Sequence, residues 1–386
     1  MHKIQRNIND VNILVNISKS NGILLEQSFT INNNINDSIS IIDIIKLISK
    51  DKYIPMFATW ELLDKCNFNC PFCYIVGHSN NKIIRFAEIK KEIEVLIDKG
   101  LFYVILTGGE PFLHPDFLDI YLFLKKNGVL VEIYSNLSML SNKIINTFKK
   151  YPPYKIEVSI YGINNESFSK VTNSNADYYD ILNNINKLKQ LGIPIKCKTP
   201  INKLTILEFE KIRDYCKSKN IDFYFSTKIF DAYDGTNKQN FKVRNEILYK
   251  YDALKIKSSN SKIIFNKTNE IKKCFDCGIK NYGLHINSKF ELLPCSEFRI
   301  SEAKFDILEN GMSNALKKYR NFVNQYIGKD IIGCYGCEAY NICKMCPALS
   351  IPVRNQKEKI INFKAPQMFC ESLQNEVKYL KKEKLI

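Results

Sequence analysis

The sequence predicts an α/β fold in which helices cover a parallel sheet, followed by a small loop-rich domain that holds most of the cysteines. Two observations support this prediction. Residues 56–230 alternate short apolar segments with segments of helical periodicity, which implies parallel strands joined by right-handed crossovers. Residues 271–372 show little regular pattern but contain eight of the 13 cysteines. We therefore expect the functional loops of the larger domain at the carboxyl ends of its strands.

The first 55 residues have the weakest pattern. Residues 12–17 could form a strand, and the isoleucine-rich residues 38–48 a helix capped by Asp37 or Ser38. Two interpretations of residues 1–55 stay open. They form either an N-terminal extension packed on the main domain or part of a peptide-docking module, and they are too short for a complete winged helix.

Six strands and five helices are expected between residues 56 and 230. Gly100, Gly128 and Gly192 mark three of the helix ends. The expected strands are 57–63, 102–106, 129–134, 155–161, 194–199 and 221–226, and the expected helices are 85–99, 115–127, 141–150, 177–190 and 206–219. The polar residues 231–270 are expected to form a connector. The last segment, residues 373–386, is expected to form a C-terminal helix, because the lysine-rich pattern from Ser372 to Lys384 is helical.

Composition limits the classes of function. The apolar content of 45% suits a protein with a hydrophobic core, and no apolar run approaches the roughly 20 residues that span a bilayer. Thirteen cysteines without a signal-peptide pattern indicate a cytoplasmic protein that binds metal, since that compartment keeps thiols reduced. The net charge of +16 comes from dispersed lysines. It indicates a basic surface or an acidic peptide partner and disfavours nucleic acid.

The first chemical motif is Cys66-x3-Cys70-x2-Cys73, which directly follows the first expected strand. Three thiols on one short loop can converge on one soft metal centre. Structural zinc sites and ordinary four-iron clusters use four protein ligands, so three thiolates would leave one iron open to a small molecule. A zinc knuckle or a disulfide-forming loop is the alternative interpretation of the three cysteines alone.

The second motif is Gly108-Gly109-Glu110, directly after the second expected strand. Glycine lets a backbone approach a ligand closely, and Glu110 supplies a carboxylate acceptor. An ordinary strand-to-helix turn is the alternative. Together the two motifs resemble the signature of the radical S-adenosylmethionine (radical SAM) enzymes.

That resemblance implies a partial (β/α)6 barrel and a four-iron (4Fe-4S) cluster on Cys66, Cys70 and Cys73. The open iron of such a cluster binds the amino and carboxylate groups of SAM. One electron, from a donor such as flavodoxin or ferredoxin, then cleaves SAM to methionine and a 5′-deoxyadenosyl radical, which abstracts hydrogen from a substrate.

The resemblance also implies SAM contacts for other residues. Gly108, Gly109 and Glu110 match the motif that binds the methionine amino group. The remaining matches are Phe72 and the Tyr74 backbone at the adenine, Ser135 and Asn136 at the end of the third strand, Ser159 near the ribose, and Lys198 as a partner of the SAM carboxylate. Three have structural alternatives, since Phe72 could belong to the core, Ser159 could be a strand-end hydroxyl and Lys198 could be exposed.

The cysteines after residue 271 resemble the SPASM domain, which holds two auxiliary 4Fe-4S clusters, making three clusters in all. The resemblance assigns Cys274, Cys277, Cys295 and Cys346 to one cluster, and Cys334, Cys337, Cys343 and Cys370 to the other. Many members have three residues between the thiols that match Cys343 and Cys346, whereas this chain has two. The pairing is therefore less firm than the number of clusters, and two zinc sites are the alternative.

The expected function is maturation of a ribosomally made peptide or a protein by a thioether or carbon–carbon crosslink. One alternative is a sulfatase-maturing enzyme that makes formylglycine. Those enzymes carry Asp directly after the cysteine that matches Cys295, where this chain has Ser296 and then Glu297. Oxidative tailoring of a haem or another cofactor is a second alternative. A non-catalytic iron–sulfur electron carrier is a third, although a carrier needs neither an open iron nor a Gly-Gly-Glu turn.

Overall fold

The computed structural model describes most of the 386-residue chain. The described residues are 2–8, 11–20, 23–31, 34–35, 40–75, 82–258, 271–340, 343, 347–355 and 360–383. Within these ranges, no helix is long and apolar enough to cross a membrane.

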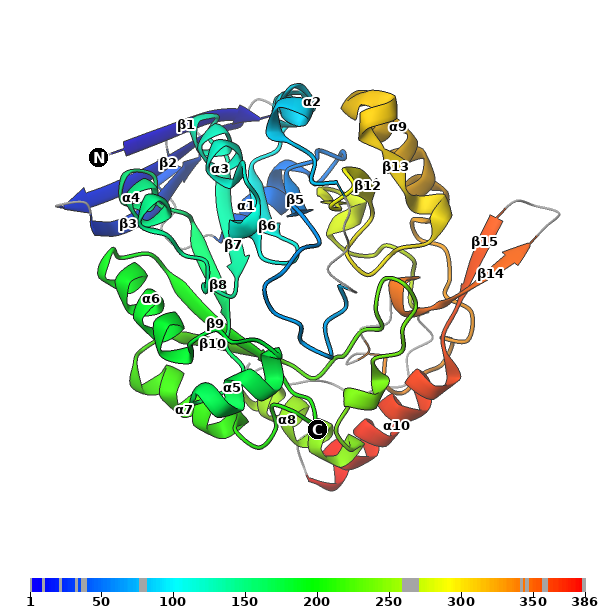
Figure 1. The fold of residues 1–386 in the computed structure, drawn as a ribbon. Helices are drawn as coiled ribbons and strands as arrows, with labels where there is room; N and C mark the ends of the chain where they lie inside the picture. The colour runs from blue at the N-terminus through cyan, green and yellow to red at the C-terminus, as the bar shows by residue number, and fades with distance from the viewer. Residues whose placement is uncertain are drawn as a thin grey trace.

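A nine-stranded sheet forms the centre of the molecule, in the order β10-β9-β8-β7-β6-β5-β11-β12-β13. Strands β5 to β10 are parallel and curve into a partial barrel (Figure 1). Their bounds are β5 Phe57–Glu61, β6 Tyr103–Thr107, β7 Leu130–Ser135, β8 Lys155–Ser159, β9 Ile195–Pro200 and β10 Asp222–Ser226. The expected α/β fold with six parallel strands is confirmed.

Helices cover the outer side of the barrel (Figure 1). They are α2 Phe86–Asp98, α3 Phe117–Lys126, α4 Asn142–Lys150, α5 Asn165–Thr172, α6 Tyr178–Gln190 and α7 Phe209–Ser218. Gly100, Gly128 and Gly192 all have positive φ at the helix ends, where glycine is favoured. Helix α5 was not expected. Its sequence is short and polar, and Asn164 caps it by accepting from the backbone N–H of Ser167.

The two sides of the sheet differ in character. Strand residues such as Val104, Leu106 and Ile133 pack under the outer helices in the main hydrophobic core. On the inner side, Tyr103 and Ile105 pack against the isoleucines of helix α1 (Ile41–Ile48). Helix α1 therefore fills the barrel interior on the side away from the strands' carboxyl ends.

Ahead of α1 lies a four-stranded antiparallel sheet of β1 His2–Ile8, β2 Val11–Ser20, β3 Ile23–Ile31 and β4 Asn34–Ile35. Of the elements in the first 55 residues, only a strand at residues 12–17, which lies within β2, and helix α1 were expected. Ile8 and Ile13 of this sheet join the core of α1, and Arg6 donates to the carbonyl oxygens of Ile97 and Asn127 at the ends of two outer helices. The N-terminal segment is therefore packed on the barrel.

The C-terminal part of the chain continues the barrel sheet. Strand β11 (Gly283–Ile286) pairs in parallel with β5, and β12 (Glu291–Leu293) and β13 (Phe305–Asp306) follow antiparallel. Helix α9 (Ile307–Tyr326) packs on this extension, next to α2. The C-terminal region is loop-rich, as expected, but it also contains helix α9, which was not expected. The apolar periodicity of α9 begins after Gly311, where φ is 72° and the helix is kinked.

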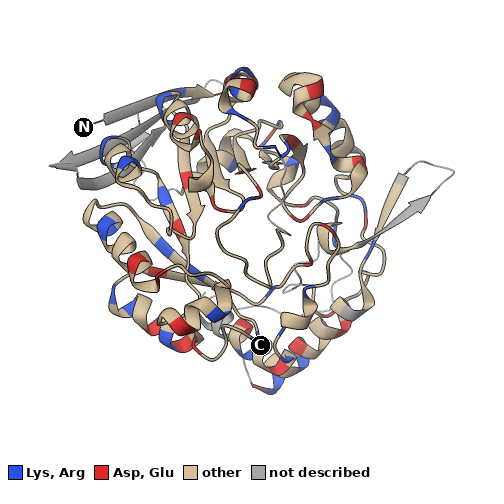
Figure 2. Ribbon diagram, viewed as in Figure 1, with Lys and Arg blue, Asp and Glu red and all other residues tan. Residues whose placement is uncertain are grey.

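The remaining elements also correct the expectations. Helix α8 (Asn245–Ser258) lies within the expected connector 231–270, although residues 259–270 are outside the described ranges. Its Tyr249 hydroxyl donates to the carbonyl oxygen of Ser372 in α10 (Gln367–Lys382), so helix α8 is attached to the C-terminal helix. Strands β14 (Ile351–Asn355) and β15 (Ile360–Lys364) form a separate hairpin. Lys and Arg are interspersed with Asp and Glu over the outer helices (Figure 2).

Candidate functional site

A cavity of about 340 Å³ opens at the carboxyl ends of the barrel strands. It is the meeting point of the residues singled out in the sequence. Eleven of them line it: Cys66, Cys70, Phe72, Cys73, Tyr74, Gly108, Gly109, Ser135, Asn136, Ser159 and Lys198. Glu110 is absent from the described lining.

The loop with the three thiols crosses the cavity between β5 and α2. Asn69 N–H donates to the carbonyl oxygen of Thr172, and Cys73 N–H donates to that of Cys70. Phe68 N–H points at Cys66 Sγ at 3.4 Å, and Asn136 Nδ2 lies 3.8 Å from the same sulfur. Both donors favour a sulfur that carries negative charge.

Burial raises the pKa of Cys66 to about 12 and also raises the pKa values of Cys70 and Cys73. Three partly buried thiols in one loop are costly to ionise unless a metal supplies the compensating charge. Among the described residues, no three His, Cys, Asp or Glu side chains could hold one metal ion together. A four-iron cluster places a separate iron behind each thiolate, and the three thiols of this loop are the type and number of ligand that would hold three such irons.

The two glycines allow the turn after β6 to pack against the backbone of this loop. A Cβ on Gly109 would lie 2.1 Å from the carbonyl oxygen of Lys65, and a Cβ on Gly108 would lie 2.4 Å from that of Leu63. The backbones are also hydrogen-bonded, since the N–H groups of Gly109 and Glu110 donate to Leu63 and Lys65. The glycines therefore set the distance between the turn and the thiol loop.

Glu110 joins neighbouring strand ends instead of facing the cavity. Its carboxylate accepts from Ser135 Oγ at 2.8 Å, Asn136 N at 2.8 Å and Phe112 N at 3.1 Å. The side chain is fully buried, and burial raises its pKa to about 7. Its position indicates that Glu110 holds the end of β7 against the turn, and that Ser135 and Asn136 reach the cavity lining from there.

Lys198 reaches the cavity from β9 above a polar network inside the barrel. Its Nζ lies 3.5 Å from Glu157 Oε2 and 3.2 Å from the centroid of the Tyr134 ring. Burial lowers the pKa of Lys198 to about 8, against the opposing effect of Glu157. Lys155 bridges Glu157 and Glu132 beneath it. Lys198 is therefore a partly buried cation rather than an exposed lysine.

The lining also contains residues that were not expected. Tyr224, Lys228 and Phe230 come from β10 and the segment after it, and Glu297 comes from the turn after Cys295. Glu297 is the one carboxylate in the described lining, and Ser296 Oγ donates to it at 2.9 Å. Only Glu297 had a sequence signal, as the second residue after a cysteine of the second domain.

One of the two expected C-terminal sets of thiols is described in full. Burial and, to a smaller extent, the thiols of Cys343, Cys370 and Cys337 together raise the pKa of Cys334 to about 11. These four cysteines form the set that the SPASM resemblance assigns to one cluster. In the other set, Cys274 is buried and Cys277 is exposed, and Cys346 lies outside the described residues.

Comparison with known proteins finds a family model that matches part of the chain. Residues 60–216 match the model of the Radical SAM superfamily. The chain is 26% identical over 167 residues to the AdoMet-dependent heme synthase of Methanosarcina barkeri, covering 42% of this chain and 47% of that protein. It is 24% identical over 167 residues to the subtilosin biosynthesis protein AlbA of Bacillus subtilis, covering 42% and 37%. The matched segment thus spans less than half of either relative.

Two solved structures share the fold over most of the chain. SuiB of Streptococcus suis bound to the precursor peptide SuiA has a TM-score of 0.62 at 14% identity, covering 90% of this chain and 94% of that chain. The structure of anSMEcpe with AdoMet and the Kp18Cys peptide has a TM-score of 0.61 at 14% identity, covering 85% and 97%. At this identity the likeness shows the fold alone, which is a partial barrel followed by a C-terminal extension.

Proposed function

We propose that this chain, an enzyme with a radical SAM domain over residues 60–216, modifies a ribosomally made peptide by a thioether or carbon–carbon crosslink. The observation that carries the proposal is the single cavity at the strand ends. It joins the three thiols and the Gly-Gly turn to a wall of aromatic and charged side chains. One side of the cavity can hold SAM while the other faces a substrate.

The residues present fit a 4Fe-4S cluster with SAM. Cys66, Cys70 and Cys73 would hold three irons, and the loop places no further described cysteine in the lining. A cluster bound there supplies the electron that cleaves SAM and generates the 5′-deoxyadenosyl radical. The backbone of the Gly108-Gly109 turn is the group on this wall that would meet the methionine end, and Lys198 is the cation that would meet a carboxylate.

Aromatic side chains shape the rest of the SAM side. Phe72 packs edge-on against Tyr161 with ring centroids 5.5 Å apart, and both line the cavity beside Ser159. This arrangement gives an adenosine group apolar faces to stack on and a hydroxyl at the end of β8.

The peptide substrate is proposed from the relatives and from the cavity wall. AlbA is a bacteriocin biosynthesis protein, and SuiB was solved with a precursor peptide. The exposed Tyr224 with Lys228 and Glu297 offers contacts for the mixed side chains of a peptide. The two C-terminal thiol sets would hold auxiliary clusters, and the chemistry that such clusters would supply is one-electron transfer.

The partners follow from the same chemistry. A low-potential carrier such as flavodoxin or ferredoxin would supply the electron. A cytoplasmic location would keep the 13 cysteines reduced and able to bind iron. We assign the radical SAM barrel to residues 56–230 and the auxiliary-cluster domain to residues 271–372.

Tailoring of a haem-type precursor is the second candidate function. The relative from Methanosarcina barkeri is a heme synthase, and the cations Lys198 and Lys228 in the lining would pair with the carboxylates of such a substrate. Both functions share SAM cleavage, so only the substrate distinguishes them.

The test begins with anaerobically reconstituted protein, dithionite and SAM. Synthetic precursor peptides encoded beside the gene and an iron tetrapyrrole with propionate groups are then assayed in parallel. Loss of two hydrogens from a peptide, with one equivalent of 5′-deoxyadenosine, supports peptide maturation. Turnover of the tetrapyrrole alone favours the second function, and absence of 5′-deoxyadenosine from every sample contradicts both.

A further inference from the structure

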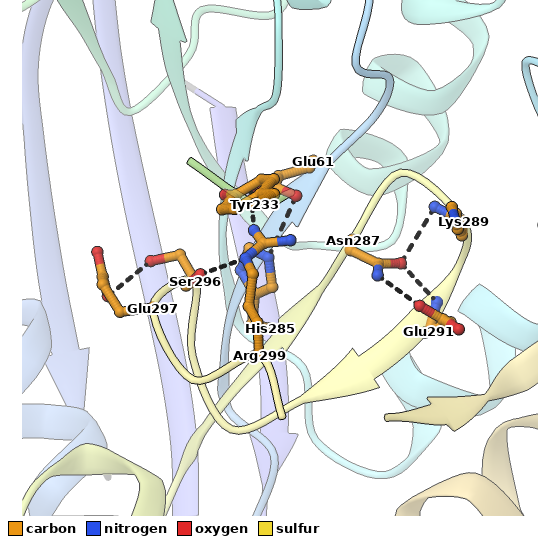
Figure 3. A network of polar contacts seen from close by, with 9 residues as sticks. All are labelled: Glu61, Tyr233, His285, Asn287, Lys289, Glu291, Ser296, Glu297 and Arg299. Carbon is orange, nitrogen blue, oxygen red and sulfur yellow. Dashed lines mark hydrogen bonds and ion pairs between the residues drawn. The ribbon is translucent and has the colours of Figure 1, made fainter. Parts of the chain in front are cut away.

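A buried ion cluster lies beside the cavity, at the end of β5 (Figure 3). Its centre is Glu61, the last residue of the strand, with 1% of its surface exposed. The carboxylate accepts from Arg299 Nη2 at 2.8 Å and from the Tyr233 hydroxyl at 2.5 Å, both at Oε1. His285 Nε2 lies 3.5 Å from Oε2. Three side chains from three other parts of the chain therefore meet at the carboxylate of Glu61.

The cluster holds one wall of the cavity through Arg299. Arg299 Nε also donates to the carbonyl oxygen of Ser296 at 2.5 Å, so a single guanidinium joins the end of β5 to the turn after Cys295. Glu297, which lines the cavity, is in this turn. The position of Glu297 relative to the thiol loop consequently depends on the pair formed by Glu61 and Arg299.

The cluster holds a second wall through Tyr233. The Tyr233 ring lies beneath the Arg299 guanidinium, and its backbone N–H donates to the carbonyl oxygen of Tyr74 at 3.0 Å. Lys238 Nζ donates to the carbonyl oxygen of Pro71 at 2.8 Å. The segment 228–238, which contributes Lys228 and Phe230 to the lining, is thereby fastened to the loop of the three thiols.

We propose that Glu61 is a positioning residue: through Arg299 and Tyr233 it fixes the turn 295–299 and the segment 228–238 against the end of β5, and so sets the geometry between the substrate side of the cavity and the thiol loop. This inference rests on the proposed function, because it assigns the two fastened segments to the substrate side. Glu61 itself does not line the cavity, so it acts through its partners.

The electrostatics of the site require a carboxylate at this position. Burial alone would raise the pKa of Glu61, but His285 and Arg299 lower it to about 2, so Glu61 is ionised at every working pH. Its negative charge balances the largely buried Arg299. Removing the charge would leave an uncompensated guanidinium close to the thiol loop.

The test compares Glu61→Gln with Asp116→Asn in the full-length reconstituted protein. Asp116 accepts a two-point contact from Arg85 away from the cavity lining, so its substitution breaks a similar ion pair elsewhere in the barrel. Trypsin cleavage after Lys228 and Lys238 reports how often segment 228–238 opens. The midpoint potential of the cluster at Cys66–Cys73 reports the local charge.

We expect Glu61→Gln to accelerate cleavage at these two lysines about tenfold or more and to raise the potential, since a buried negative charge is lost beside the segment that is hydrogen-bonded to the thiol loop. Asp116→Asn should do neither. Arg299→Lys, which keeps the charge but loses the second contact, should show a smaller acceleration than Arg299→Met. Equal behaviour of Glu61→Gln and Asp116→Asn in both measurements would overturn the proposal.

Two further measurements keep the result interpretable. Tyr233→Phe removes one hydrogen bond only, and we expect a few-fold faster cleavage after Lys238 even if Glu61→Gln does not fold. No acceleration in this variant would count against the proposal. Wild-type protein that forms no 5′-deoxyadenosine would refute the proposed function, while the cleavage rates would still show whether Glu61 fastens the segment.

Discussion

Substitution of Gly109 by alanine tests whether the close approach of the turn and the thiol loop is required. The new Cβ would lie 2.1 Å from the Lys65 carbonyl oxygen, 2.5 Å from its carbonyl carbon and 2.6 Å from the Asp64 carbonyl oxygen. Normal contacts between such atoms are about 3.5 Å, so the two backbones must separate by about 1 Å. The atoms that clash belong to the backbone, so no side-chain rotation can relieve the contact.

This separation has two expected consequences. Overpacking of this kind costs about 1–3 kcal/mol of unfolding free energy, which urea unfolding of the metal-free protein measures. A displacement of about 1 Å at a reacting centre lowers activity by roughly 100-fold, which 5′-deoxyadenosine formation under anaerobic conditions measures.

Gly283→Ala is the matched control, because its Cβ would meet the carbonyl carbon of Gly278 at a milder 3.2 Å. We expect this control to retain SAM cleavage within a few-fold of wild type. If Gly109→Ala cleaved SAM at the wild-type rate, the argument that the glycines set the distance between the turn and the loop would be refuted.

Three further predictions follow from the same structure. The raised pKa of Glu110, about 7, means that the folded state favours the protonated acid. The unfolding free energy should therefore fall as pH rises from about 4.5 to about 7, by on the order of 3 kcal/mol, whereas Glu110→Gln should lack this pH dependence in urea titrations. Replacing Cys66, Cys70 and Cys73 together by alanine should leave about eight irons per chain and abolish 5′-deoxyadenosine formation; loss of all iron would show that the thiol sets are not independent. Cys370→Ala should remove about four irons and leave SAM cleavage in place, and an unchanged iron content would exclude Cys370 from the cluster on Cys334.

The sequence was sufficient to predict the barrel because the two patterns that indicate it, apolar strand segments and glycines at helix ends, are both local in the chain. Apolar strands such as Tyr103–Thr107 are short and continuous, and glycines such as Gly128 end the helices within a residue or two of the expected place. The three-thiol and Gly-Gly-Glu motifs were identified by spacing within single loops, and the other SAM contacts by family resemblance. Of the residues expected at the SAM site, the structure brings all but Glu110 to one cavity.

The features that escaped prediction depend on contacts between distant segments. The role of Glu110 follows from the register of β6 and β7, which places Ser135 and Asn136 beside it. The cluster at Glu61 needs Arg299, which is 238 positions away in the chain. No spacing rule connects such residues, because they become neighbours only when β11 pairs with β5.

Helix α9 was missed for a different reason. Met312, Leu316, Tyr319 and Val323 are buried at helical spacing, so the signal is present in the sequence. The cysteines on either side drew the interpretation towards a loop-rich domain held together by metal. The packing of α9 against α2 shows that apolar burial also stabilises this part of the chain.

The central claim is that the loop of Cys66, Cys70 and Cys73 forms an open iron–sulfur site that cleaves SAM. The most direct measurement determines iron, sulfide and zinc per chain in anaerobic protein and assays 5′-deoxyadenosine on the same sample after reduction. The account predicts about twelve irons together with SAM cleavage. Zinc at the C-terminal thiols with four or fewer irons would contradict the auxiliary clusters, and a fully loaded protein that forms no 5′-deoxyadenosine would contradict the account as a whole.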